Sequence, residues 1–376
     1  MRFIHSADWQ IGKVFKQFGA KEEALRQARL GAVERLGQLA HTHGVAHVLV
    51  AGDVYDSEAP NPITLRAPIE RMKLFPDIQW HLLPGNHDPH RPEGIWDRIA
   101  KLGLPGHVHL HLSPFVAPLG DGAFLMPAPL CRKTEYDDVT MWMDSAPTPA
   151  GAVRIGLAHG SIVNFGQEGE ASNPIDPARP SRAGLDYLAL GDWHRTMQVG
   201  PSVWYSGTPE PDRAGRQETG TALLVDIAGA GAPPAVTPLA TGTYRWITRS
   251  ERVADAEGGA GLDQRLRAEP DLARTIVRLK LEGALSIAAA ADLQRRLVDL
   301  EAAAFHLDVD QTELAVRPTQ ADLEAIDFDG VLARAADRLK GTCDDLAQSP
   351  DQRRHAEEAL VELFLRVANK NGKEAA

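Results

Sequence analysis

The sequence predicts an α/β protein in which a large first domain is followed by a second, smaller α/β domain. Two observations carry this prediction. Over the first hundred residues, apolar runs of strand length alternate with longer segments of helical periodicity. Near residue 245, polar residues stop recurring at strand ends, and Ala, Arg, Asp and Leu become more frequent. We therefore expect a largely parallel sheet first and a separate compact unit after it.

The first domain begins with a β-α-β-α-β series. Its expected strands and helices are, in chain order, residues 2–8, 21–43, 45–51, 63–74 and 78–83, with a further helix near 94–102. Strands separated by helices of this length are joined by right-handed crossovers, so we expect them to be parallel.

The middle of the chain is rich in strand patterns. We expect strands at 107–112, 123–127, 153–158, 187–190, 203–206 and 222–227, a helix near 135–144 and a long loop over 161–182. His107, His109 and His111 alternate along one strand and so share a face. Because no carboxylate lies near them in the sequence, an exposed strand face is preferred over a second metal site.

The remainder of the chain predicts a small α/β domain. The expected elements are a strand at 275–281, a helix at 288–304, a short strand at 313–316 and an amphipathic terminal helix at 351–369. Gly258-Gly259-Ala260-Gly261 predicts a flexible patch. The predicted domains are a large α/β domain at 1–240, a small α/β domain at 245–335 and a helical segment at 336–376.

Composition narrows the function classes. No apolar run approaches the roughly 20 residues that a membrane helix needs, and the N-terminus lacks the apolar core of a signal peptide. The two cysteines, Cys131 and Cys343, form no disulfide framework or cysteine zinc site, so we expect a cytoplasmic protein. The net charge of −11 argues against coating nucleic acid by bulk electrostatics, but not against a nucleic-acid enzyme that binds metal ions.

Polar residues recur at the carboxyl ends of the expected strands, where α/β sheets bind their ligands. The stretch around Asp53 is central, because Gly52 ends an apolar run and tolerates a sharp turn there. The full set is Asp8, Gln10, Asp53, Asp56, Asn86, His87, Asp88, His159, Asp192 and His194. Carboxylate, imidazole and amide oxygen together suit manganese, and no thiolate indicates a softer metal. Two ions about 4 Å apart need a bridging carboxylate, for which Asp53 is the natural candidate.

In this order the motifs resemble those of a known family. They are Asp8-x-Gln10, Gly52-Asp53-x-x-Asp56, Gly85-Asn86-His87-Asp88, Ala158-His159-Gly160 and Gly191-Asp192-x-His194. They are similar to the motifs of calcineurin-like metallophosphoesterases and, more narrowly, of SbcD-type DNA repair nucleases, over roughly residues 1–228. The resemblance implies a metallophosphoesterase β-sandwich flanked by helices, followed by a small α/β domain that caps DNA.

The resemblance also implies roles for the site residues. One divalent ion would take Asp8, Gln10, Asp53 and His194, and the other Asp53, Asn86, His159 and Asp192. The family usually has His at positions 10 and 192. Gln10 can bind directly through its carbonyl oxygen or act through water, whereas Asp192 is a harder ligand that favours manganese or magnesium over zinc. His87 is left to orient the phosphate or protonate the leaving group, with Asp88 and Asp56 supporting it or a ligand.

The predicted function is a two-metal phosphodiesterase that hydrolyses DNA, and the resemblance implies manganese-dependent exonuclease and endonuclease activity. Resemblance implies a homodimer working with an SbcC-type SMC-like ATPase, since the chain itself has no Walker A loop. A small-molecule phosphodiesterase of the same fold and a weakly catalytic or non-catalytic DNA-end-binding subunit remain as alternatives. Basic residues are scattered, so no DNA-binding residue is assigned.

Overall fold

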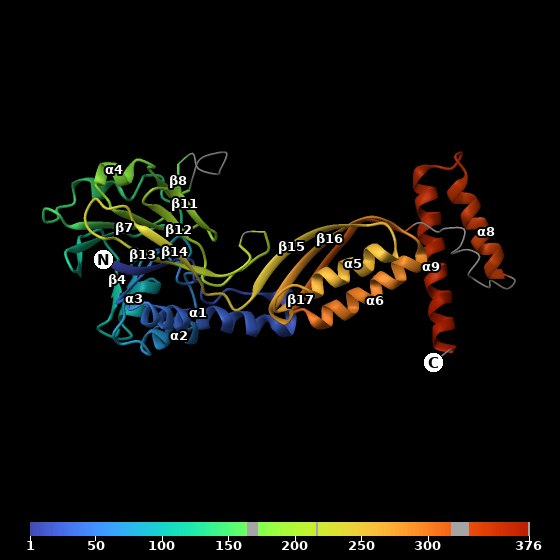
Figure 1. The fold of residues 1–376 in the computed structure, drawn as a ribbon, viewed down its shortest axis with the longest axis horizontal. Coiled ribbons are helices and arrows are strands. Elements are labelled where there is room, and N and C mark those ends of the chain that lie inside the picture. Colours follow the sequence, from blue (N-terminus) through green and yellow to red (C-terminus); the bar gives the residue numbers. More distant parts are fainter. Residues whose placement is uncertain (164–171, 216, 317–330, 375–376) are drawn as a thin grey trace. The chain divides into compact units, whose positions relative to one another are not determined.

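The computed structural model describes residues 1–163, 172–215, 217–316 and 331–374 (Figure 1). The chain divides into two compact units, Met1–Trp246 and Ile247–Ala376. Strands and helices are mixed in both units, which confirms the predicted α/β class. The three predicted domain boundaries, including a separate segment at 336–376, remain predictions.

The first sheet of the first unit has the strand order β14-β13-β1-β2-β3-β4. Its parallel strands β1 (Arg2–Ser6), β2 (His47–Val50), β3 (Gln79–Leu82) and β4 (Val108–Leu110) are joined through α1 (Glu22–Thr42), α2 (Pro62–Met72) and α3 (Ile95–Ala100). The parallel arrangement predicted from the β-α-β-α-β series is therefore confirmed. β13 (Thr221–Asp226) pairs antiparallel with β1, and β14 (Ala235–Ala240) forms the edge.

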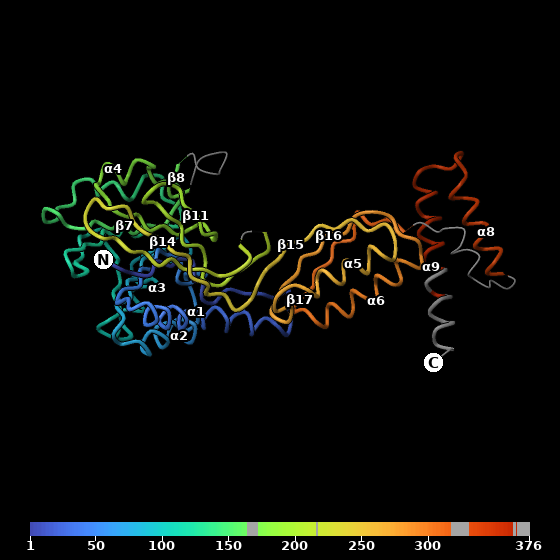
Figure 2. The backbone as a smooth tube through the Cα atoms, viewed as in Figure 1, coloured from blue at the N-terminus to red at the C-terminus, as the bar shows by residue number. Residues whose placement is uncertain are grey.

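The second sheet packs against the first to form a sandwich (Figures 1 and 2). Its order is β11-β12-β10-β7-β6-β5, from β5 (Ala117–Gly120), β6 (Ala123–Ala128), β7 (Val153–His159), β10 (Tyr187–Gly191), β11 (Thr196–Gly200) and β12 (Val203–Ser206). Phe3 and Leu49 of the first sheet share one buried core with Ile155 and Ala189 of the second. Because the parallel strands of both sheets end near each other, their terminal residues can form one site.

The prediction of a helix near 135–144 is wrong. This segment forms only a short 3-10 turn, Met141–Ser145, because the Asp138 carboxylate accepts a hydrogen bond from the Thr140 backbone N–H at 2.8 Å and fixes a local turn. Part of the expected 161–182 loop, residues 164–171, lies outside the described residues. The rest contains β8 (Ser161–Ile162), β9 (Pro174–Ile175) and α4 (Arg179–Ala183).

The prediction that His107, His109 and His111 lie on an exposed strand face is also wrong. His111 is only 3% exposed, because a row of imidazoles covers it. His81 Nε2 lies 3.1 Å from His47 Nδ1, and His81 Nδ1 lies 3.0 Å from His111 Nε2. His109 stacks on His81 with ring centroids 4.9 Å apart. The sequence could not show this row, because it forms across β2, β3 and β4.

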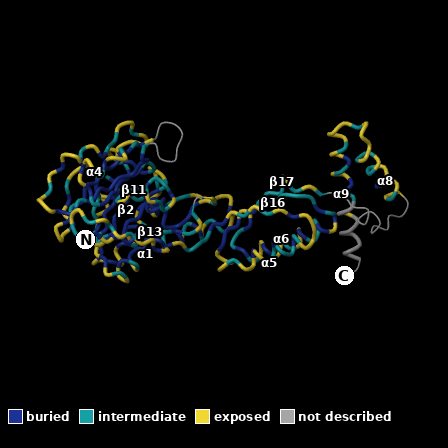
Figure 3. Tube along the Cα trace, turned by 45° about the horizontal axis from the view of Figure 1, so that its top comes forward, coloured by how far each residue is buried: buried dark blue, intermediate teal, exposed yellow. Residues whose placement is uncertain are grey.

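The second unit contains a three-stranded sheet in the order β15-β16-β17, formed by Arg245–Val253, Thr275–Leu285 and His306–Val316. The helices α5 (Ala256–Arg267) and α6 (Ile287–Ala303) pack on it, and α8 (Val331–Asp344) and α9 (Pro350–Glu374) follow. Figure 3 shows the buried residues of this unit between the sheet and the two helices. β16 and β17 are parallel and joined through α6.

The predicted flexible glycine patch is wrong, since Gly258 to Gly261 lie inside α5. The Asp255 side chain caps the helix by accepting from the Gly258 N–H at 2.7 Å. Leu262 and Leu266 are then buried in the core of the unit. Tertiary packing of this apolar face outweighs the poor helix propensity of glycine.

None of the described helices is both long and apolar enough to cross a membrane. This includes the 25-residue helix α9.

Two glycines of α1 give a matched stability test. A Cβ at Gly37 would lie 2.5 Å from the buried Phe75 ring, whereas one at Gly31 would meet only the Arg35 guanidinium at 3.3 Å. We expect Gly37→Ala to destabilise the first unit by about 1–3 kcal/mol, because overpacking outweighs the gain in helix propensity of about 1 kcal/mol. Gly31→Ala should be neutral or stabilising. Six of the seven tryptophans lie before β15 and the seventh, Trp246, lies in β15, so urea unfolding followed by tryptophan fluorescence reports mainly on the first unit. Equal destabilisation by both variants would contradict the proposed clash.

The histidine row predicts a pH dependence of stability. Burial lowers the pKa of His111 to about 4, and the pKa of His81 is also lowered by burial. The unfolded chain therefore binds more protons than the folded chain between about pH 6.5 and pH 4, and the unfolding free energy falls as pH drops through this window. Between pH 7.5 and pH 5, the unfolding free energy of His111→Gln should fall by about 2 kcal/mol less than that of the wild type. Tryptophan-monitored urea unfolding at the two pH values measures this difference. The partly exposed His107, changed to Gln, is the control and should keep the wild-type slope. Identical slopes for wild type and His111→Gln would contradict the assignment.

Candidate metal centre

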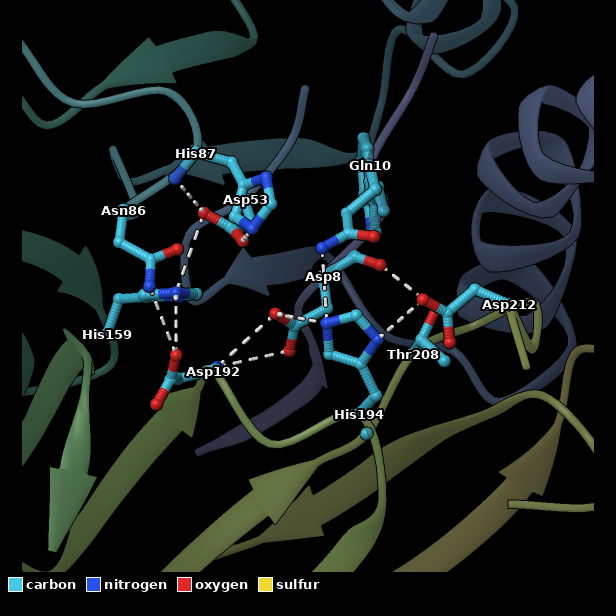
Figure 4. Close-up of polar contacts among 12 residues, drawn as sticks. Asp8, Gln10, Asp53, Asn86, His87, His159, Asp192, His194, Thr208 and Asp212 are labelled. Carbon is cyan, nitrogen blue, oxygen red and sulfur yellow. Dashed lines mark hydrogen bonds and ion pairs between the residues drawn. The ribbon is translucent and has the colours of Figure 1, made fainter. Parts of the chain in front are cut away.

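The predicted polar residues meet where strands of both sheets end (Figure 4). Asp8 follows β1, Asp53 follows β2 and Asn86 follows β3. His159 is the last residue of β7, and Asp192 directly follows β10. The sandwich therefore brings together residues that are far apart in sequence, such as Asp192 and Asp8, which are 184 positions apart and whose N–H and carboxylate lie 3.2 Å from each other.

Several of these residues have a left-handed backbone. The φ angles are 55° at Asp8, 44° at Gln10, 54° at Asp53 and 102° at Asp192. They account for four of the eight non-glycine residues with positive φ in the described part of the chain. Such conformations cost about 1–3 kcal/mol each and persist at functional sites where the surroundings hold them. Here backbone hydrogen bonds do so, from Asp8 N–H to Gly52 O at 3.1 Å and from Gln10 N–H to Asp53 O at 2.9 Å.

Two glycines allow the side chains to approach the backbone. A Cβ at Gly52, where φ is 87°, would lie 2.3 Å from His159 Nδ1. A Cβ at Gly85 would lie 2.2 Å from Asp53 Oδ1. The glycine predicted to turn the chain before Asp53 thus also makes room for a histidine of the opposite sheet.

One half of the site, which we call the His159 side, contains Asp53, Asn86, His159 and Asp192. His159 Nδ1 donates to Ala51 O at 2.8 Å, which turns Nε2 toward Asp53 Oδ1 at 3.5 Å and Asp192 Oδ1 at 3.9 Å. His159 Nε2 and Asn86 Oδ1 are both buried without a hydrogen-bond partner among the described residues. A buried polar atom left unpaired is costly, and a bound cation would satisfy both atoms.

The electrostatics of the His159 side favour positive charge. Burial alone would lower the pKa of His159, but Asp53, Asp8 and Asp192 raise it to about 9. Burial, together with Asp53 and Asp192, raises the pKa of Asp8 to about 6. Ligand atoms of Asp8, Asp53 and His159 all lie within 4.8 Å of one another. These donors therefore fit a hard-to-borderline divalent cation.

The other half, which we call the His194 side, contains Gln10 and His194. His194 Nε2 lies 3.7 Å from Asp8 Oδ1 and 3.1 Å from Gln10 Nε2. On its other edge, Nδ1 lies 3.1 Å from Asp212 Oδ2. A carboxylate in this position fixes the ring orientation of a metal-binding histidine.

Asp212 and Lys13 were not identified from the sequence. Lys13 Nζ contacts Gln10 Oε1 at 2.8 Å and Asp212 Oδ2 at 3.0 Å. Burial alone would raise the pKa of Asp212, but His194, Arg29 and Lys13 hold it well below its usual range. The sequence signal for Asp212 is limited to its position inside residues 1–228, over which the chain resembles the family.

The three predicted catalytic residues differ in their access to the site. His87 is half-exposed at the pocket, with its N–H donating to Asp53 Oδ1 at 2.9 Å and Nδ1 3.0 Å from Asp56 O. Asp56 thus supports His87 through its backbone rather than its carboxylate. Asp88 is fully buried and accepts from the N–H groups of Gly85 and Tyr55 at 2.7 and 3.0 Å. The expectation that Asp88 holds the His87 ring is therefore wrong, because both its oxygens bind the backbone.

A pocket of about 400 Å³ opens onto part of the proposed ligand set. Its lining residues are Gln10, Lys13, Asp53, Asn86, His87, Asp192, His194, Asp212 and Arg213. Asp53, Asp192 and Asp212 contribute carboxylates to this lining, and Lys13, His87 and Arg213 contribute basic side chains. The pocket can therefore combine bound cations with groups that contact an anion.

The chain belongs to the calcineurin-like phosphoesterase family, whose model matches residues 1–225. Members of this family are phosphoesterases that bind divalent metals. The match covers the β-sandwich up to β13 and includes every site residue named above. The family membership expected from the five motifs is thus confirmed.

Two curated relatives show which proteins of this family the chain is similar to. The chain is 29% identical over 287 residues to the D subunit of the nuclease SbcCD of Rhodobacter capsulatus, covering 62% of this chain and 68% of that protein. It is 27% identical over 260 residues to the D subunit of the nuclease SbcCD of Escherichia coli K12, covering 56% and 61%. The matches thus span about two thirds or less of these relatives. The crystal structure of TT1561 of Thermus thermophilus is 13% identical, with a TM-score of 0.37 over 59% of this chain and 93% of that chain, a score from which we conclude nothing further.

Metal binding should stabilise the first unit. Manganese at about 100 times its dissociation constant should add about 2.7 kcal/mol and raise the Tm by about 5 °C or more. Asp53→Asn should abolish this rise, because the amide keeps an acceptor for the His87 N–H but loses the shared negative charge. Tryptophan-monitored thermal unfolding, once with manganese and once with EDTA, measures the rise in Tm. Asp226→Asn, on the exposed end of β13, is the control and should respond like the wild type. A full rise in Asp53→Asn would exclude Asp53 as a ligand.

Proposed function

We propose that this protein is a manganese-dependent phosphodiesterase that hydrolyses DNA, with the exonuclease and endonuclease activity of an SbcD-type nuclease. The observation that carries the proposal is the convergence of Asp53, Asn86, His159 and Asp192 below a pocket with His87 at its wall. Membership of a phosphoesterase family and two curated relatives named as nuclease subunits support it.

The residues have separate tasks in this proposal. Asp53, Asn86, His159 and Asp192 would hold one divalent ion, and Asp8, Gln10, Asp53 and His194 the other. Bound ions in such sites acidify water to a nucleophile and neutralise charge on the phosphate. His87 Nε2 lies 3.9 Å from Asp53 Oδ2, and the Nδ1 contact with Asp56 O fixes the ring. His87 is thereby placed to bind a phosphate oxygen or to give a proton to the leaving oxygen.

The partners and location follow from the same proposal. The curated relatives are named as one subunit of the nuclease SbcCD, which supports an SbcC-type SMC-like ATPase as the partner. We further propose a homodimer, a cytoplasmic location and a DNA-capping role for the second unit.

A second candidate is a weakly catalytic subunit that binds DNA ends. The observation in its favour is that the Gln10 carbonyl oxygen, one of the expected ligands, already accepts a hydrogen bond from Lys13 at 2.8 Å. A measurement of manganese binding distinguishes the nuclease from the DNA-end-binding subunit, because the second would bind little manganese.

Cleavage of linear duplex DNA in manganese tests the proposal. The wild type should digest the DNA, and His87→Gln should slow digestion about 10²–10⁴-fold while keeping the manganese-induced Tm rise, because His87 is not a ligand. Asp226→Asn should digest at the wild-type rate. A gel time course gives the rates, and a small chromogenic phosphodiester assayed in parallel distinguishes a small-molecule enzyme. Cleavage of only the small substrate, or equal rates for wild type and His87→Gln, would contradict the proposal.

A further inference from the structure

Lys13 places a fixed positive charge on the His194 side of the site. Its ammonium nitrogen lies 2.8 Å from Gln10 Oε1, 3.0 Å from Asp212 Oδ2 and 3.6 Å from Asp56 Oδ1. The side chain is 23% exposed, so the ammonium is largely enclosed by these acceptors. It lines the same pocket as Gln10 and His194.

The local backbone brings Lys13 to this position. The Lys13 N–H donates to Gln10 O at 3.1 Å, which closes a four-residue turn from Gln10 to Lys13. Within the turn, Gly12 has a φ of 96°, and a Cβ there would lie 2.9 Å from Thr64 Cγ2. The turn therefore folds the Lys13 side chain back over Gln10, the residue whose oxygen an ion on this side would need.

The two sides of the site differ in what their acceptors already bind. On the His159 side, His159 Nε2 and Asn86 Oδ1 have no hydrogen-bond partner among the described residues. On the His194 side, Gln10 Oε1 accepts from an ammonium group, and Gln10 Nε2 lies 3.1 Å from His194 Nε2. A cation on the His159 side therefore displaces no hydrogen bond from these two atoms, whereas a cation on the His194 side must displace the Lys13 ammonium from Gln10 Oε1.

We infer that the two sides accept divalent cations unequally and in a fixed order. The His159 side binds the first ion, while the Lys13 ammonium supplies the positive charge on the His194 side. A second ion enters there only after Lys13 leaves Gln10 Oε1. This inference rests on the proposed divalent-metal centre and concerns its occupancy.

The size of the effect follows from the contact that must break. A hydrogen bond between a charged group and its acceptor contributes enough to change a binding constant by about 10-fold to 100-fold. Lys13 also lies within reach of any ion held by Gln10, and two like charges in a largely enclosed pocket repel each other. The second ion should therefore bind at least about tenfold more weakly than the first.

Manganese titration of the full chain tests the order of binding. Calorimetry should give one tight and one weak ion in the wild type, and electron paramagnetic resonance at two equivalents should remain that of isolated manganese. In Lys13→Met, which keeps the length and removes the charge, the second ion should bind about tenfold more tightly, and a spin-coupled two-manganese spectrum should appear. Lys13→Arg keeps the charge and should resemble the wild type. Lys16→Met, an exposed lysine of the same region, is the matched control.

The outcomes separate this inference from the proposed function. Two ions of equal affinity in the wild type, or an unchanged second affinity in Lys13→Met, would overturn the inference and leave the phosphodiesterase proposal intact. An absence of manganese binding in every variant would overturn both. If Lys13→Arg behaved like Lys13→Met, packing rather than charge would control the second ion, which also overturns the inference. Metal-free thermal unfolding confirms that each variant is folded before titration.

Discussion

The main constraint on the first unit is that several carboxylates are held close together and away from water. Burial raises the pKa of Asp8 to about 6, and burial with the nearby Asp53 charge raises the pKa of Asp88 well above its usual range. Histidines face these carboxylates, and backbone N–H groups bind Asp88, Asp53 and Asp8. The left-handed backbone at the strand ends adds further strain. Such an arrangement is unfavourable by itself, and a divalent cation relieves the repulsion among the carboxylates.

The helical layer contributes to the site through a buried guanidinium. Arg29 of α1 is 2% exposed and donates to Trp9 O at 2.7 Å and to Glu210 O at 2.9 Å. It thereby joins the segment after β1, which carries Asp8 and Gln10, to the segment after β12, which carries Asp212. The Glu210 carboxylate is itself held by Arg35 and by the Thr243 and Tyr244 N–H groups. Helix α1 therefore holds the segment that carries Gln10 beside the segment that carries Asp212, in addition to covering the sheet.

The sequence could predict what depends on local pattern and strand order. Parallel strands separated by helices place their carboxyl ends at one edge, so strand order alone groups Asp8, Asp53 and Asn86. The histidine row and the Asp212 contact could not be predicted, because each requires the pairing of strands that no local pattern specifies. The helix over Gly258 and Gly259 was missed for a related reason: glycine disfavours a helix locally, and only the packing of α5 against α6 compensates. The contact expected between Asp88 and the His87 ring does not form, because the Asp88 carboxylate binds the backbone N–H groups of Gly85 in its own loop and of Tyr55.

Gln10 and Asp192, the two departures from the pattern that the motifs resemble, act in the same electrostatic direction. Asp192 places a carboxylate beside His159 and Asn86, and Ser161 holds it by donating to Oδ2 at 2.8 Å. This makes the His159 side more negative. Gln10 replaces a basic ring by a weaker ligand and accepts from Lys13, which makes the His194 side less attractive to a cation. Asp192 adds a negative charge on the His159 side and Lys13 a positive charge on the His194 side, so we infer that together with the uncharged Gln10 they move cation affinity toward the His159 side. The local turn that carries Lys13 explains how this can occur without altering the sandwich or the remaining ligands.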